Sequence, residues 1–249
     1  MMSFGDDSGQ VPPLRLVRAT CLPMPIPSST PPAGTPGPSD EWPGLPLFPL
    51  GTVLFPGGLL PLRIFEVRYL DMIRRCHREG RPFGVVALTQ GQEVRQAGAG
   101  PEAFHAVGTL ATVAELSAPQ PGLFMIRAHG GCRFRLSSSQ QLPHGLWVGE
   151  TQPLPDDPAV PVPEELQGHA HALARLLDTL SAQVGDAKGR MPVREPWRLE
   201  DCAWVANRWS ELLPLPLETK QQLMALDNPV LRLELVGDLL SPAARRKTA

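Results

Sequence analysis

The fold is decided by Leu45-Pro46-Leu47-Phe48-Pro49-Leu50-Gly51-Thr52-Val53-Leu54-Phe55-Pro56-Gly57-Gly58-Leu59-Leu60-Pro61-Leu62-Arg63-Ile64. This stretch is too apolar for a linker, and its prolines lack the N–H group that a helix interior needs. In Pro56-Gly57-Gly58, proline presets φ and glycine accepts a positive φ, which is typical of a turn. The stretch therefore predicts three short strands, at Leu45–Phe48, Val53–Phe55 and Leu59–Ile64.

The segment that follows predicts one helix and then more strands. Apolar residues at spacings of three and four indicate a helix from Phe65 to Cys76, with Gly80 as its stop. Buried or alternating apolar runs predict strands at Phe83–Leu88, Ala106–Leu116, Leu123–Ala128, Cys132–Leu136 and Leu146–Glu150. His129-Gly130-Gly131 would then be the glycine turn of a hairpin.

The last third of the chain predicts helices. They are expected at Glu164–Val184, Asp201–Leu213, Leu217–Leu226 and Val230–Leu240, with Asn228 as the N-cap of the last one. Strands followed by helices indicate an α+β fold, with a small twisted or barrel-like sheet that carries one helix and then a helical bundle.

Composition divides the chain into four parts. Residues 1–43 are rich in Pro, Ser and Gly and predict a disordered extension, with a Pro-rich ligand for a partner as the alternative. The β-rich part is expected at 44–155, the helical part at 163–241 and a basic tail at 242–249.

Net charge and cysteine content limit the classes of partner and the cellular setting that we expect. The net charge of −2 gives no global attraction to nucleic acid or to an anionic membrane. The acidic start excludes an ordinary signal peptide, and no stretch approaches the roughly 20 apolar residues of a membrane span. Four widely spaced cysteines predict free thiols in a reducing, cytoplasmic setting.

Four segments carry a family resemblance. They are the opening stretch, Val107-Gly108-Thr109-Leu110-Ala111-Thr112-Val113-Ala114-Glu115, Gly130-Gly131-Cys132-Arg133-Phe134-Arg135-Leu136, and Leu213-Pro214-Leu215-Pro216-Leu217-Glu218-Thr219-Lys220-Gln221-Gln222-Leu223-Met224. In this order they resemble the N-terminal, substrate-binding domain of Lon proteases over about 44–240. The resemblance implies a PUA-like β part followed by a helical part.

The catalytic parts of a Lon protease have no counterpart here. None of the three lysines follows a glycine, so the Gly-Lys-Ser/Thr of a Walker A loop is absent, and so is the Ser-Lys protease segment. His129 and Cys132 have the spacing of half a metal site, but no second pair completes it. We therefore expect a stand-alone, non-enzymatic domain with no metal and no cofactor.

Two functions from different classes compete, and an uncharacterised hydrolase is a third. The resemblance implies binding of unfolded or flexible polypeptide, or of a partner such as a separate protease or ATPase, near Leu59, Leu60 and Phe65 in a groove between the two parts. Analogy with PUA-like folds suggests RNA binding through Arg127, Arg133 and Arg135 on adjacent strands. The acidic balance and the lack of interleaved aromatic residues count against nucleic acid.

Overall fold

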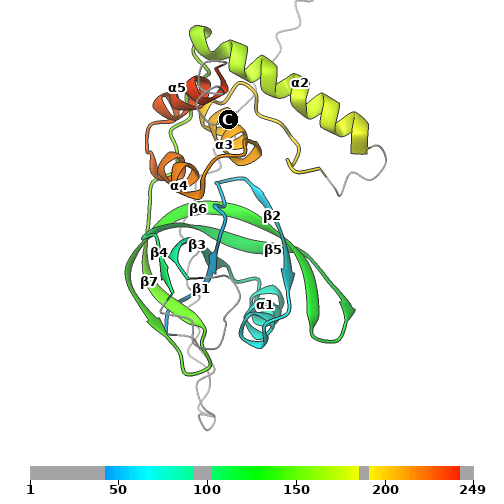
Figure 1. Cartoon of the computed structure of the whole chain (residues 1–249), viewed down its shortest axis with the longest axis vertical. Coiled ribbons are helices and arrows are strands. Elements are labelled where there is room, and N and C mark those ends of the chain that lie inside the picture. The colour runs from blue at the N-terminus through cyan, green and yellow to red at the C-terminus, as the bar shows by residue number, and fades with distance from the viewer. Residues whose placement is uncertain (1–42, 92–101, 185–190, 242–249) are drawn as a thin grey trace, which may run out of the picture. The chain divides into compact units, whose positions relative to one another are not determined.

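The β part is a sheet that closes on itself. A computed structural model describes residues 43–91, 102–184 and 191–241 (Figure 1). Its strands are β1 (Leu45–Leu50), β2 (Leu59–Ile64), β3 (Phe83–Gln90), β4 (Ala103–Phe104), β5 (Val107–Gln120), β6 (Leu123–Gln141) and β7 (Trp147–Pro153). They follow the order β1-β7-β6-β5-β3, and a parallel β1–β3 pairing closes the ring into a pseudo-barrel. Strand β2 adds to β6 outside this ring.

One helix, α1 (Val67–Glu79), packs on the β part. It buries Tyr69, Met72, Ile73 and Cys76, and the Tyr69 ring stacks on Phe48 with 4.1 Å between centroids. Gly80 ends the helix in the left-handed conformation, with φ of 63°. The expected helix and its glycine stop are confirmed, but the helix begins at Val67 rather than Phe65, and Phe65 is exposed instead of lying on the buried face.

Two local predictions are wrong. Val53–Phe55 is a buried connection with no strand pairing. Val53 and Phe55 pack against the helical part, and the Leu54 carbonyl accepts from the Thr109 hydroxyl of β5 at 2.6 Å. His129–Gly131 is not a turn, because β6 continues through it with a shift in its pairing register to β5, and the hairpin turn lies instead at Gly122, with φ of 76°. Gly130 has a different role: the Gly57 amide donates to its carbonyl, and its amide donates to the Gly58 carbonyl, at 2.9 Å each.

The C-terminal part is helical, as expected. It contains a short 3₁₀ turn η1 (Glu164–Leu166) and the helices α2 (Gln167–Val184), α3 (Cys202–Leu212), α4 (Leu217–Ala225) and α5 (Pro229–Leu240). Asp201 and Asn228 cap α3 and α5, each accepting two backbone N–H bonds. Helix α2 buries Ala170, Leu173 and Leu177.

The helical part and the β part share one core, and all described residues belong to one compact unit. Val53, Phe55, Ala87 and Val107 of the β part lie in the same hydrophobic cluster as the buried faces of the helices. A second cluster lies between α1 and the barrel. The predicted β-rich part, 44–155, and helical part, 163–241, are thus packed together, while residues 1–42 and 242–249 fall outside the described residues.

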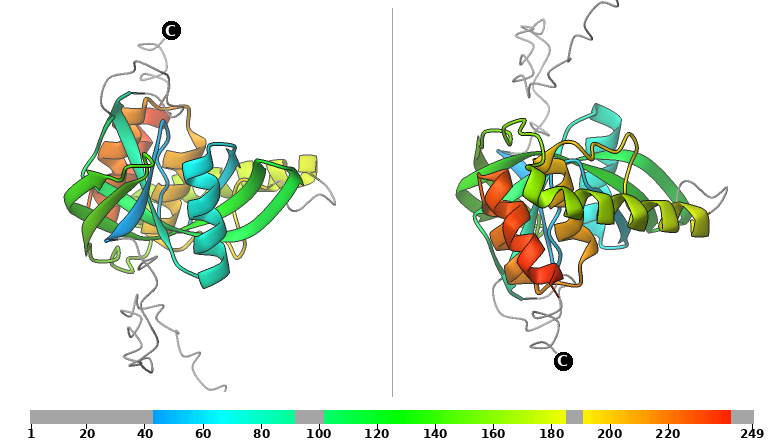
Figure 2. Two further views of the ribbon diagram at one scale, coloured as in Figure 1. Left: turned by 90° about the horizontal axis from the view of Figure 1, so that it is seen from below. Right: turned by 90° about the horizontal axis from the view of Figure 1, so that it is seen from above.

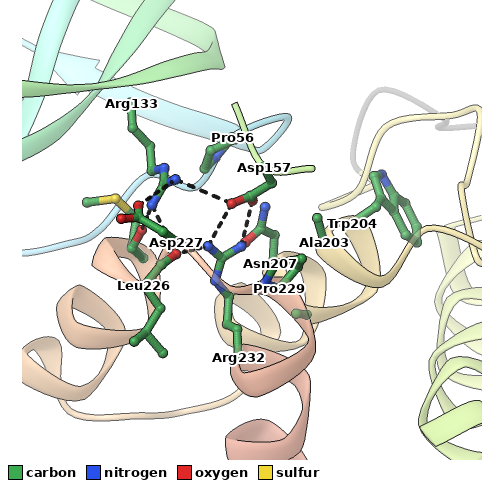
Figure 3. Close-up of polar contacts among 12 residues, drawn as sticks. Pro56, Arg133, Asp157, Ala203, Trp204, Asn207, Leu226, Asp227, Pro229 and Arg232 are labelled. Carbon is green, nitrogen blue, oxygen red and sulfur yellow. Dashed lines mark hydrogen bonds and ion pairs between the residues drawn. The ribbon is translucent and has the colours of Figure 1, made fainter. Parts of the chain in front are cut away.

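Buried arginines add polar contacts to this junction (Figure 3). Arg133 of β6 donates to the Met224 and Leu226 carbonyls at 3.1 and 3.0 Å and pairs with Asp157. Arg232 of α5 pairs with the same carboxylate at 2.7 Å. One aspartate from the 154–163 connection therefore links a strand to the last helix.

The described cysteines do not all have the same bonding state. Cys76 and Cys202 are free and buried, but Cys132 is disulfide-bonded, so the prediction of free thiols throughout is wrong. Within the described ranges, no helix is both long and apolar enough to cross a membrane.

Candidate functional site: a groove between the sheet and the helical part

A groove of about 390 Å³ lies where β2, β5 and β6 meet the end of α2 and residues 191–195. Pairing of the strands explains which residues form the floor of the groove. Arg127 of β6 lies opposite Pro61 of β2 and Glu115 of β5, and His129 lies opposite Leu59. Directly paired residues share one face of a sheet, so these side chains line the same surface.

The apolar part of the groove comes from segments far apart in the sequence. Leu59 belongs to β2, Val184 is the last residue of α2, and Met191 and Val193 lie in the segment that follows. Val193 is buried and anchors that segment in the shared core. The other three are only half-buried, so a bound apolar side chain could cover them further.

Charged groups of both signs surround this apolar surface. Glu115, Arg127, Arg194 and Glu195 all line the groove. The Arg127 guanidinium donates to the Met191 carbonyl at 3.2 Å, and the Arg194 guanidinium lies 3.2 Å from His129 Nδ1. Burial and the charges of Arg194 and Arg127 lower the pKa of His129, so its neutral ring accepts this bond at pH 7. The two arginine contacts attach residues 191–194 to the sheet.

The Pro56-Gly57-Gly58 turn fixes the position of the β2 end of the groove. Arg208 of α3 donates to the Gly57 and Pro56 carbonyls at 2.6 and 2.8 Å and pairs with Glu211 at 3.2 Å. A Cβ on Gly58 would lie 1.9 Å from Glu211 Oε1, so only glycine allows this approach. Because Leu59 follows directly, α3 sets where the strand enters the groove.

Glu211 has an unusual environment beneath that turn. Burial raises its pKa to about 7, although the charge of Arg208 and a hydrogen bond from the Phe55 amide lower it. The Lys220 ammonium donates to the Glu211 carbonyl at 2.8 Å, and burial lowers the pKa of that lysine. The turn is thus held by a buried group of charges.

The three residues predicted to bind a partner do not lie together. Leu59 lines the groove, but Leu60 points to the opposite face of β2 and packs on the core beneath α1. Alternation along a strand separates these neighbours. Phe65 follows the end of β2, is 51% exposed and does not line the groove.

The three arginines of the nucleic-acid alternative also do not share an exposed face. Arg127 is half-buried in the groove and Arg135 is exposed. Arg133 is 3% exposed, and its guanidinium is occupied by carbonyls and carboxylates. The sequence predicted that these arginines lie on strands, but it did not show that the helical part covers Arg133.

Sequence reasoning did not find Val184, Met191, Val193 and Arg194 as members of the site. Nothing in their local pattern distinguishes them from an ordinary helix end and loop, and Arg194 meets His129 across 65 positions. Within the described ranges, no group of three His, Cys, Asp or Glu side chains could hold a metal ion.

Comparison with known proteins gives the family. The family model "ATP-dependent protease La (LON) substrate-binding domain" matches residues 44–241. The chain belongs to the LON substrate-binding domain family. A Lon protease of Anaeromyxobacter dehalogenans (strain 2CP-C) is 28% identical over 204 residues, which is 79% of this chain. The LON domain chain spans 23% of the length of that relative.

Solved structures agree with the family. A Lon N-terminal domain protein from Xanthomonas campestris is 31% identical, with a TM-score of 0.60, over 79% of this chain and 98% of that one. The N-terminal domain of the Mycobacterium avium complex Lon protease is 17% identical, with a TM-score of 0.51, over 78% of this chain and 96% of that one, and shows the fold alone. The predicted PUA-like α+β fold and the predicted family are confirmed.

Proposed function

We propose that this LON domain protein binds flexible polypeptide segments in the groove formed by Leu59, Met191 and their neighbours. The observation that supports this most is the position of the groove, at the junction of the sheet and the helical part of a chain whose family is a substrate-binding domain. The sheet and the helical part would then both contact the bound segment, and the core that they share fixes their relative position.

The chemistry of the groove fits polypeptide better than a single small ligand. Apolar side chains lie beside two arginines and two glutamates, so an extended chain with mixed side chains finds both apolar and charged contacts. Half-buried Met191 supplies a flexible, polarizable surface that adapts to different side chains. Such a site favours low sequence specificity.

We propose a non-catalytic role that needs no cofactor. The matched family is a substrate-binding domain, and the curated relative that extends beyond it is a Lon protease. Bound polypeptide would therefore be passed to, or held near, a separate protease or ATPase. This partnership is part of the proposal.

The test is fluorescence anisotropy with a labelled, permanently unfolded polypeptide. We expect saturable binding by the whole chain that persists at moderate salt, because apolar contacts carry most of it. Leu59→Asp should weaken binding about tenfold, a loss of about 1.4 kcal/mol, by placing a charge on the apolar floor.

The matched control is Val67→Asp, which makes the same change at an exposed position that does not line the groove. It should leave the affinity unchanged. Equal affinity for all three proteins, or no binding by the unmodified chain, would overturn the groove proposal. Thermal melts of each variant separate a lost contact from a lost fold.

A further inference from the structure

A second groove, of about 410 Å³, lies between α4 and α5, which Figure 2 shows beside each other in orange and red. Leu223 and Leu226 line it from the α4 side, and Leu235 and Leu239 line it from α5. None of its lining residues lines the first groove. The proposed polypeptide site does not use this surface.

The apolar character of the groove follows from the pattern of α5. Leu233 and Val236 face the core and are fully buried. Leu231, Leu235 and Leu239 recur every fourth residue on another face, and Leu231 and Leu235 remain 41% and 39% exposed. A helix that buries one apolar face and exposes a second one has surface for a partner.

The exposed charged residues of α4, α5 and their connection are all acidic among the described residues: Glu218, Asp227, Glu234 and Asp238. Asp238 lines the groove and Glu234 lies one turn before it on α5, whereas Glu218 pairs with His105 and Asp227 pairs with Arg133. The positive residues of these helices are turned inward: Lys220 donates to the Glu211 carbonyl, and Arg232 is 1% exposed. An apolar groove with an acidic rim on α5 favours a ligand with apolar anchors and a basic flank.

We propose that the α4–α5 groove binds a basic amphipathic helix of a partner protein. Leucines that repeat along a helix match the i, i+4 spacing of apolar anchors on a docking helix. Lys or Arg on its flanks would lie near Glu234 and Asp238, which have no ion-pair partner among the described residues.

A second copy of this chain is a poorer occupant. Its exposed basic helix is α1, where Arg74 and Arg78 face solvent. The apolar face of α1, with Met72, Ile73 and Cys76, is already buried in its own core. A copy could therefore offer the charges but not the apolar anchors on the same helix.

The experiment measures binding of the full chain to two synthetic helical peptides. Both carry Leu at i, i+3, i+4 and i+7 spacing, and the remaining positions are Lys in one peptide and Glu in the other. We expect saturable binding of the Leu-Lys peptide and at least about tenfold weaker binding of the Leu-Glu peptide. Equal affinities, or no binding of the Leu-Lys peptide, would overturn the proposal.

Variants locate the site. Leu235→Arg and the double change Glu234→Lys with Asp238→Lys should each weaken Leu-Lys binding about tenfold or more. Asp178→Lys, a charge reversal on the exposed side of α2, is the control and should not. If all variants bind equally well, the peptide binds elsewhere and the proposal fails.

Light scattering completes the test. A dimer that Leu235→Arg dissociates would make a second copy the occupant and would also overturn the proposal. Because Leu235 and both carboxylates are exposed, the variants should keep the melting temperature of the unmodified chain. Binding of unfolded polypeptide at the first groove is measured in parallel and should not respond to these changes.

Discussion

At the scale of single residues, Gly130 shows how close approach of two backbones constrains a sequence. A Cβ at this position would lie 2.3 Å from the Phe55 carbonyl oxygen, whereas a Cβ on neighbouring Gly131 would meet nothing closer than 3.5 Å. We expect Gly130→Ala to lower the free energy of unfolding by about 1–3 kcal/mol, because the connection must move away from β6. Gly131→Ala should change it by less than about 0.5 kcal/mol. Urea unfolding measures both, and equal effects would contradict the packing argument.

Glu211 makes a residue-scale prediction about pH. In the folded chain its pKa is raised to about 7. Between the ordinary pKa of a glutamate and pH 7, folding is therefore coupled to the uptake of a proton. The contribution of this residue to stability is therefore greatest at low pH, falls as pH rises toward 7, and is constant above it. The Glu211→Gln variant lacks this dependence. Its unfolding free energy, subtracted from that of the unmodified chain, should give a difference that decreases by roughly 1–3 kcal/mol between pH 5 and 8. Parallel pH profiles of the two proteins would contradict the assigned environment.

At the scale of elements, two of the three arginines of β6 have opposite surroundings. Arg133 links the strand to the end of α4 and to Asp157, while Arg135 is exposed two residues later. Arg133→Met should lower the unfolding free energy by about 3–5 kcal/mol, because Asp157 and two carbonyls lose a buried partner. Arg135→Met should cost no more than about 0.5 kcal/mol. Chemical denaturation of the pair measures this contrast, and similar losses would show that Arg133 is not held as described.

The elements also show what the sequence could and could not predict. Proline and glycine positions, helical spacing and N-caps are local, so Pro56-Gly57-Gly58, Gly80 and Asn228 were assigned correctly. The glycine at 130 was misread because a turn and a close backbone approach have the same local signature. Leu59 and Leu60 were predicted to bind a partner together, but neighbouring residues of a strand face opposite sides, and only Leu59 lines the groove. Residues 191–195 form the other side of the groove through long-range packing, which a local pattern does not show.

At the scale of the whole molecule, the junction between the β part and the helical part decides how the chain unfolds. Phe55 and Val107 are packed in one cluster with the buried helix faces, and Arg208 joins α3 to the turn before β2. Removing the helices would expose these apolar groups and leave carbonyls without their partner, so unfolding either part while the other stays folded would cost free energy. The chain should therefore unfold in one cooperative transition rather than as two domains.

Two buried thiols allow a direct test of this cooperativity. Cys76 lies in α1 on the barrel and Cys202 begins α3, and burial raises the pKa of each to about 11, so both are protected from labelling while folded. Thiol labelling at increasing urea, read by mass spectrometry of each peptide, gives an opening free energy at each site. We expect equal values that match the global unfolding free energy, and labelling of the unfolded chain supplies the intrinsic rate as control. Earlier opening at Cys202 would show that the helical part detaches first. The groove would then be a hinge between two bodies rather than a fixed site, and polypeptide affinity would fall as the helical part opens.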